Sequence, residues 1–268
     1  MIGTLDKMRT RQGEQVQYQL VVGEQTLDLN PLIGKPFSFT YTGNIYCCHC
    51  GRKTRKSYSQ GYCFPCMKKL AQCDMCILKP ETCHHHLGTC REPDWGTAHC
   101  MIPHIVYLAN TSGLKVGITR QVPTRWMDQG ATQALPLIRV ATRRIAGLVE
   151  VALAEFINDK TNWRALLKGD GEPLDLKAEA VRLLPLIEQR LADLKLQFGA
   201  DAWQVLDEEV VEFNYPVEQH PSKLSSFNLD KEPTVAGTLL GIKGQYLILD
   251  TGVINVRKFT SYEVELAP

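Results

Sequence analysis

Apolar and polar residues alternate at both ends of the chain, with the period of two that is typical of β-strands. Segments of this kind, rich in β-branched and aromatic residues, run over 16–22, 36–41, 237–241, 245–249 and 253–256. Gly3-Thr4-Leu5 near the start is echoed by Gly237-Thr238-Leu239 near the end. Two interpretations stay open: the two β units complete one small barrel, or they are unrelated β meanders.

The middle of the chain has a helical period instead. Apolar residues recur every three or four positions over 142–158, with Phe156 on the same stripe, and again over 176–198. Pro185 predicts a bend or a break in the second of these helices. We expect both stripes to face the core and the segment 169–173, which contains two glycines and a proline, to form a loop.

Composition narrows the class of protein. The 268 residues are 44% hydrophobic and 22% charged with a net charge of +1, and no apolar run approaches the ~20 residues that cross a bilayer. Residues 1–20 show neither an apolar signal region nor a cleavage site, so we expect a cytoplasmic protein with reduced thiols and no membrane partner. Residues 170–232 are acid-rich, so only a local argument for nucleic-acid binding holds.

Ten cysteines are crowded into residues 47–100, and reduced thiols at this density indicate metal ligands. Two C-x2-C pairs with twelve residues between them are formed by Cys47, Cys50, Cys63 and Cys66. Two such pairs supply the four thiolates of a tetrahedral Zn2+ site, with bonds of ~2.3 Å. We therefore predict a zinc ribbon, in which Cys48 leaves the register of the first pair open.

A second group of cysteines follows the ribbon and consists of Cys73, Cys76, Cys83, Cys90 and Cys100, with His84–His86, His99 and His104 nearby. Cys73 and Cys76 form another C-x2-C pair, so we predict a second zinc held by this pair and by two of the other three cysteines. An iron–sulfur cluster also takes four thiolates and stays an alternative.

Basic residues lie between the cysteines of the ribbon, with no acidic residue from Cys47 to Leu70. They are Arg52, Lys53, Arg55 and Lys56, followed after the second pair by Lys68 and Lys69, and Tyr58, Tyr62 and Phe64 lie between the two basic groups. Basic groups neutralise phosphates and aromatic faces stack on unpaired bases, so this composition favours contact with DNA or RNA. A solvated loop without a ligand is the alternative.

Two apolar strands, 104–109 and 114–120, are joined by the turn Asn110-Thr111-Ser112-Gly113, which predicts a β-hairpin, and a short helix is predicted to begin near Thr124. Motifs on this hairpin resemble those of the GIY-YIG nuclease superfamily. Ile105-Val106-Tyr107 stands where that family has Gly-Ile-Tyr, and Lys115-Val116-Gly117 stands where it has Tyr-Ile-Gly.

Three later residues complete this resemblance, which covers about residues 105–164. Arg125 has the spacing of the family's arginine, Glu150 resembles its metal-binding glutamate and Asn162 resembles its late asparagine. Ile105 and Lys115 depart from the family pattern, although Lys-Val-Gly followed by Ile-Thr resembles one branch of the superfamily.

The resemblance implies a divalent-metal-dependent phosphodiesterase. Glu150 would hold Mg2+ or Mn2+, with Asn162 as a further site residue, and Arg125 would pair with a phosphate oxygen. Tyr107, or Lys115 if neighbouring arginines lower its pKa, would orient or deprotonate the attacking water.

Three functions stay open at this level: a nuclease, a non-catalytic module that binds nucleic acid or a ribosome, and an iron–sulfur protein. The arginines that serve the first two equally are Arg120, Arg125, Arg139, Arg143 and Arg144. Glu150 favours the nuclease, because a hydrolase needs a carboxylate for its metal and a binder does not. Glu155 is a rival for that metal.

The whole layout also resembles a bacterial family catalogued only as a domain of unknown function, which implies no activity. We predict an α+β protein with a small GIY-YIG-like α/β domain, a zinc-ribbon insert and β-rich flanks. The expected parts are a β-rich segment at 1–46, a cysteine-rich metal-binding region at 47–103, a GIY-YIG-like domain at 104–168, a helical acid-rich segment at 169–232 and a β-rich segment at 233–268 that packs with the first if one barrel forms.

Overall fold

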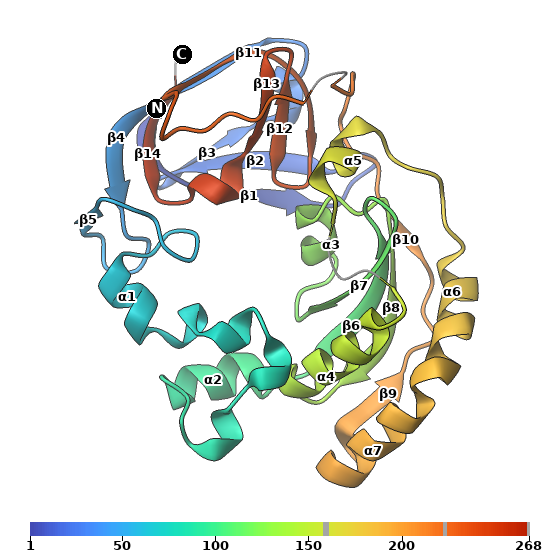
Figure 1. The fold of residues 1–268 in the computed structure, drawn as a ribbon. Coiled ribbons are helices and arrows are strands. Elements are labelled where there is room, and N and C mark those ends of the chain that lie inside the picture. Colours follow the sequence, from blue (N-terminus) through green and yellow to red (C-terminus); the bar gives the residue numbers. More distant parts are fainter. Residues whose placement is uncertain (158–160, 222–223, 267–268) are drawn as a thin grey trace.

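The computed structural model describes residues 1–157, 161–221 and 224–266. It confirms the predicted α+β class, since 31% of the chain is helical and 33% lies in antiparallel sheets. A nine-stranded sheet and a five-stranded sheet, here the large and the small sheet, are linked by a cysteine-rich stretch of short helices (Figure 1).

The large sheet combines strands from both ends of the chain. Its strands are β1 (Ile2–Arg11), β2 (Gln17–Val22), β3 (Gln25–Asp28), β4 (Pro36–Tyr46), β5 (Lys53–Thr54), β11 (Thr234–Lys243), β12 (Tyr246–Leu249), β13 (Gly252–Asn255) and β14 (Tyr262–Leu266). They run in the order β13-β12-β11-β4-β14-β1-β2-β3, and β5 pairs with β4. The strand β14 therefore lies between β1 and β4, with Val264 opposite Gly3 on one side and Tyr41 on the other.

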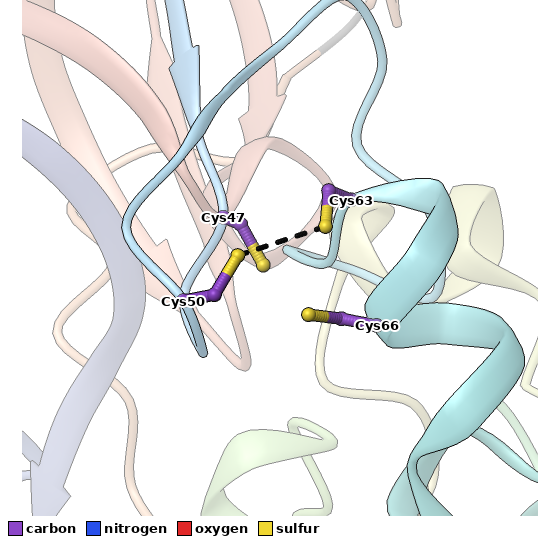
Figure 2. A group of neighbouring side chains, drawn as sticks. All are labelled: Cys47, Cys50, Cys63 and Cys66. Carbon is purple, nitrogen blue, oxygen red and sulfur yellow. Dashed lines mark hydrogen bonds between the residues drawn. The ribbon is translucent and has the colours of Figure 1, made fainter.

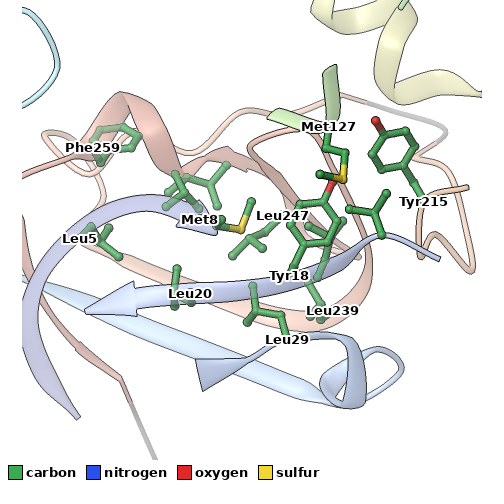
Figure 3. Packing of buried hydrophobic residues seen from close by; sticks show 14 of the residues in the cluster. Leu5, Met8, Tyr18, Leu20, Leu29, Met127, Tyr215, Leu239, Leu247 and Phe259 are labelled. Atoms are coloured by element: carbon green, nitrogen blue, oxygen red, sulfur yellow. The ribbon is translucent and has the colours of Figure 1, made fainter. Parts of the chain in front are cut away.

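The core of the large sheet follows from the alternation seen in the sequence. Tyr18, Leu20 and Val22, at every second position of β2, are fully buried. They share one cluster with Leu239 of β11 and Ile254 of β13. Figure 3 shows Tyr18, Leu20 and Leu239 in this cluster. Because residues of the edge strand β13 share this cluster with residues of β2, next to the opposite edge, the sheet curves around its own core.

The small sheet contains the predicted hairpin. Its strands are β6 (His104–Asn110), β7 (Leu114–Thr119), β8 (Gln133–Val140), β9 (Trp203–Val205) and β10 (Val211–Glu212), in the order β10-β8-β6-β7 with β9 beside β8. The helices around it are α3 (Thr124–Asp128), α4 (Arg143–Ala154), α5 (Trp163–Lys168), α6 (Leu176–Leu183) and α7 (Glu188–Phe198).

The strand β6 is buried on both faces, which explains why it is apolar at nearly every position. Val106 and Leu108 belong to the cluster formed with α4, α6 and α7. Tyr107 and Ala109, on the opposite face, belong to the core of the large sheet together with Trp126 of α3. The hairpin is therefore fixed between the helices and the large sheet.

Both predicted helical stretches form, with one correction. The Oγ1 atom of Thr142 caps α4 by accepting from the Ile145 N–H at 3.4 Å, and the helix ends at Ala154. Phe156, predicted on its buried stripe, lies beyond this end and is 44% exposed. Pro185 interrupts the second stretch as predicted, within the 3-10 turn Leu184–Ile187 between α6 and α7.

The cysteine-rich stretch, residues 47–100, contains α1 (Phe64–Lys69), α2 (Pro93–Cys100) and the 3-10 turns Ala71–Cys73, Met75–Ile77, Pro80–Thr82 and His85–Leu87. It packs closely against α4. A Cβ atom added to Gly147 of α4 would lie 2.7 Å from the carbonyl carbon of Pro80, so a glycine is needed there. None of the helices that the structure describes has the length and apolar character needed to span a bilayer.

Candidate metal centre and basic cleft

The four predicted ribbon cysteines converge on one point, here called the ribbon site (Figure 2). Cys47 and Cys50 lie just after β4, Cys63 caps the N-terminus of α1 and Cys66 lies in its first turn. Their sulfur atoms all lie within 4.8 Å of one another, and the Cys50 and Cys63 sulfurs are 3.7 Å apart. A tetrahedron with ~2.3 Å bonds has an edge of about 3.8 Å, so this group can hold a metal ion such as zinc.

Backbone amides surround the Cys47 sulfur. Burial raises the pKa of the Cys47 thiol, but N–H groups of Cys50, Cys63 and His49 outweigh this effect and lower the pKa to about 6. The thiolate is the form that binds a metal, and these amides stabilise it.

The structure answers the register question that Cys48 left open. Its side chain faces Tyr62 and the hydroxyl of Ser261, and burial raises the pKa of its thiol. The Ser261 hydroxyl also donates to the Gly61 carbonyl at 2.7 Å. Cys48 thus lies where the ribbon packs against the large sheet, and Cys47 rather than Cys48 belongs to the ribbon site.

The predicted partners Cys73 and Cys76 lie on two successive 3-10 turns. Cys73 ends one 3-10 turn and Cys76 lies in the next, with the extended residue Asp74 (ψ 154°) between them. The two side chains therefore meet different neighbours. Burial raises the pKa of the Cys73 thiol to about 11, whereas Cys76 lines a small cavity together with Cys83, Cys90 and Cys100.

A separate cleft of about 470 Å³, here the basic cleft, opens between the hairpin, α3, α4 and residues 77–80. Its basic lining consists of Lys7, Lys115, Arg120, Arg125, Arg143 and Arg257, and its acidic lining consists of Asp128 and Glu150. These residues come from β1, the small-sheet region, α4 and the turn after β13. The excess of positive charge makes the cleft suited to an anion such as phosphate.

Tyr107 and Gly117, one from each hairpin motif, fit together across the strands. They are direct partners in the β6–β7 register, and a Cβ atom on Gly117 would lie 2.6 Å from Tyr107 Oη. Tyr107 is completely buried. Burial raises its pKa to about 12 against the opposing effect of Arg125, so its hydroxyl stays protonated at neutral pH.

Gln129 connects this tyrosine to Arg125. The amide orientation that satisfies both partners has the Gln129 nitrogen donating to Tyr107 Oη at 2.7 Å. Its oxygen then accepts from Arg125 Nη2 at 3.0 Å and Nε at 3.2 Å. Gln129 belongs to no motif of the sequence, but its position four residues after Arg125 at the end of a helix places it on the same face.

Glu150 and Lys115 also line the basic cleft. Glu150 lies on α4 and is half-buried, and Lys115 lies on β7 and is 5% exposed, with its Nζ 3.5 Å from Thr161 Oγ1. Glu155, the rival metal ligand, is exposed at the end of α4, where it lies 3.9 Å from Arg190. Glu150 is therefore the glutamate of this pair that faces the cleft.

Asn162 is not brought to the cleft, which corrects its predicted place in the site. It caps α5, where its Oδ1 accepts from the N–H groups of Arg164 and Ala165 at 3.1 and 3.3 Å. Its own N–H donates to Ser112 Oγ at 2.9 Å. A polar residue that begins a helix has the same sequence signature as a site asparagine, so the pattern alone did not separate them.

Asp128 has a structural position within the cleft wall. Its carboxylate accepts from Lys7 Nζ at 2.8 Å, Gln245 Nε2 at 3.1 Å and Thr10 Oγ1 at 3.3 Å. These bonds tie α3 to both halves of the large sheet. Arg257, also from the large-sheet region, donates to Gln60 Oε1 of the ribbon loop at 2.9 Å.

The predicted nucleic-acid contacts lie on two surfaces. Arg52, Lys53, Arg55 and Lys56 are all exposed on the ribbon, next to an edge-on contact between Tyr58 and Phe64 with ring centres 5.5 Å apart. Arg120 is exposed at the basic cleft. Arg139 lies away from it, in a hollow with Trp203, and Arg144 contacts His86 at 3.0 Å.

Comparison with known proteins gives one match. The model of a family described as "Protein of unknown function (DUF2797)" matches residues 34–264, a range that includes the ribbon site and all of the basic cleft except Lys7. No curated protein and no solved structure matches the chain.

Proposed function

We propose, for a chain that belongs to the DUF2797 family, that the basic cleft is the active site of a nuclease of the GIY-YIG type. The observation that carries this proposal is the convergence of Tyr107, Lys115, Arg125 and Glu150 in one cleft. They come from β6, β7, α3 and α4, so their sequence order alone did not require them to meet. The excess of basic groups around them suits a nucleic-acid backbone.

Each residue has a chemical role that its geometry supports. Glu150 would hold Mg2+ or Mn2+, which supplies charge stabilisation at the scissile phosphate when bound. Arg125 would donate two N–H groups to a non-bridging oxygen, because Gln129 holds its guanidinium in a fixed orientation.

The choice of base changes in the light of the structure. A tyrosine with a pKa of about 12 and no exposed surface is a poor proton acceptor at neutral pH, so we assign Tyr107 to positioning Gln129 and Arg125. Lys115 is the remaining candidate of the two, and it stands where the family pattern has tyrosine. Lys115→Met should then slow cleavage strongly, whereas Tyr107→Phe should affect it mainly through binding.

Labelled DNA and RNA incubated with Mg2+ or Mn2+ test the proposal. Glu150→Gln should reduce cleavage about 100-fold or more, the size of effect seen when a group that stabilises transition-state charge is lost. Binding measured in chelator should persist, because a carboxylate does not attract a polyanion. Glu155→Gln, on the same helix but outside the cleft, is the matched control and should cleave normally.

A second candidate function is a non-catalytic module that binds nucleic acid through the same surface. The observation that favours it is that Lys115 replaces the motif tyrosine, while Tyr107 is buried and its raised pKa keeps it protonated. Wild-type protein that binds these substrates through Arg125 and cleaves none of them with either metal would establish this function and refute the nuclease.

A further inference from the structure

We propose that Arg257 is a second phosphate-binding residue of the basic cleft, and that the ribbon holds it in place through Gln60. The ligand is the phosphodiester backbone of a nucleic acid, which contacts both Arg125 and Arg257. The inference rests on the proposed function, because it takes the cleft as the place where nucleic acid binds. It concerns binding alone, so it does not require cleavage.

Arg257 lies on a turn whose backbone is fixed. The 3-10 turn Val256–Phe259 follows β13, and both of its end residues are buried in the core of the large sheet. Asn255 begins the turn, where its Oδ1 accepts from the Lys258 N–H at 3.2 Å. Thr260 Oγ1 ends it by donating to the Arg257 carbonyl oxygen at 2.9 Å. The half-buried side chain of Arg257 therefore starts from a fixed point and lines the cleft.

The guanidinium of Arg257 has donors left for a ligand. Its Nε donates to Gln60 Oε1 at 2.9 Å. Within residues 1–157, 161–221 and 224–266, the structure gives its Nη1 and Nη2 atoms no hydrogen-bond acceptor. These two atoms carry most of the N–H donors of an arginine, and with them the side chain can bind a phosphate in bidentate fashion.

The charges around Arg257 favour an anion. Burial lowers the pKa of Arg257, and the neighbouring charge of Arg125 lowers it further. The carboxylates of Asp128 and Asp6 oppose this effect, but both are bonded to Lys7, the first to its Nζ at 2.8 Å and the second to its backbone N–H at 2.7 Å. Two positive groups thus lie close together, and an anion that contacts both would replace their repulsion by attraction.

A glutamine orients each of these two arginines. Gln129 accepts from Arg125 through its amide oxygen, and Gln60 accepts from Arg257 in the same way. An amide oxygen is a neutral acceptor, so it fixes the direction of a guanidinium without neutralising its charge, whereas a carboxylate would do both. The full charge of both arginines therefore remains for a ligand in the cleft.

The loop that carries Gln60 has an unusual backbone. Tyr58 and Tyr62 close it with two hydrogen bonds of 2.8 Å between their main chains. Between them, Ser59 and Gln60 have φ angles of 46° and 61°, in the left-handed region that is unfavourable for residues other than glycine. Strain of this kind often accompanies a functional position. Here it places the Gln60 side chain against Arg257.

The same loop is where the ribbon contacts the large sheet. The Gly61 carbonyl oxygen accepts from the Cys48 N–H at 2.8 Å and from Ser261 Oγ at 2.7 Å. A Cβ atom on Gly61 would lie 3.0 Å from the Cys48 sulfur and 3.1 Å from Ser261 Oγ, so a side chain at this position would push the two surfaces apart. The contacts that dock the ribbon therefore also position Gln60, and through it Arg257.

Binding of a short labelled oligonucleotide to the full-length protein, measured in chelator across a range of salt concentrations, tests the inference. Arg257→Ala should weaken binding roughly tenfold or more, as expected for a lost hydrogen bond between charged groups, and lower the slope of log affinity against log salt by roughly 0.7 to 0.9. Arg257→Lys should keep the slope, because the charge remains, but not the full affinity. Lys258→Ala is the matched control, since it removes the same charge from an exposed residue of the same turn, and it should bind as wild type does.

Gln60→Gly separates the positioning of Arg257 from stability. Glycine adopts a φ of 61° without strain, so this protein should be at least as stable as wild type in urea unfolding. Its affinity should nevertheless fall several-fold, because Arg257 loses the bond that orients it. In the Arg257→Ala background the same change should have no further effect on affinity, since the arginine is then absent.

The outcomes distinguish this inference from the proposed nuclease. Unchanged affinity and slope in Arg257→Ala, with weaker binding in Arg125→Ala, would overturn the inference and leave the proposed function intact. An equal loss in Arg257→Ala and Lys258→Ala would also overturn it, because net charge would then explain both. Wild-type affinity in Gln60→Gly would exclude the role of the ribbon. Binding that depends on Arg257 without cleavage would refute the nuclease alone, and a wild type that binds no oligonucleotide would refute both.

Discussion

Replacing Gly117 with alanine tests the contact that places Tyr107 at the cleft. The new Cβ atom would lie 2.6 Å from Tyr107 Oη, 2.7 Å from Cζ and 3.2 Å from Cε2. Tyr107 is fully buried in the core shared with the large sheet, so its ring has little room to retreat. Overpacking of this kind costs about 1–3 kcal/mol of unfolding free energy, and we expect a value in the upper half of that range.

Urea unfolding with zinc concentration held constant measures this effect, and a double-mutant cycle identifies its cause. Tyr107→Phe should not relieve the clash, because Cζ remains at 2.7 Å. Tyr107→Ala should relieve it, so the Gly117→Ala change should cost less than about 0.5 kcal/mol in that background. Gly169→Ala is the control, since no atom lies within 4 Å of its added Cβ. A Gly117→Ala protein as stable as wild type would show that the Tyr107 ring is free to move aside.

The remaining predictions concern metal, charge and pH. Cys63→Ser should lose about one zinc equivalent, because it removes one of the four converging thiols, and an unchanged zinc content would contradict the ribbon site. The variant Arg52→Ala/Lys53→Ala/Arg55→Ala/Lys56→Ala should lower the slope of log affinity against log salt by roughly 0.7 to 0.9 for each lost phosphate contact, and equal slopes would exclude the ribbon from the interface. Burial lowers the pKa of His104 from 6.5 to about 4, so the unfolded state binds more protons between these values. The contribution of the neutral imidazole to the free energy of unfolding is therefore complete above pH 6.5. It is lost as pH falls towards 4, by up to about 3 kcal/mol. In urea unfolding at a series of pH values, His104→Gln should flatten this part of the stability profile.

Local patterns in the sequence predicted what depends on local structure. The C-x2-C spacing identified the ribbon site, and the turn before Leu114 identified the hairpin, because ligands and strand partners lie close in the chain there. The break at Pro185 follows from the missing N–H of proline.

Features that depend on long-range packing were not predicted. Lys7 and Arg257 reach the cleft only because β1 and the turn after β13 belong to one sheet. The spacing of Cys73 and Cys76 does not show how the two successive turns that carry them are oriented. Asn162 was placed in the site because a cap and a site residue have the same side chain.

The position of β14 between β1 and β4 has a consequence for synthesis of the chain. While a ribosome makes the protein, β1 and β4 emerge early, but the strand that joins them is made more than two hundred residues later. Until then each exposes an edge on which another nascent chain could pair. The ribbon site needs only residues 47–66, so it can bind its metal while the large sheet is still incomplete. We therefore expect the ribbon to fold before the large sheet, and the edges of β1 and β4 to be most open to wrong pairing in the interval between the two events.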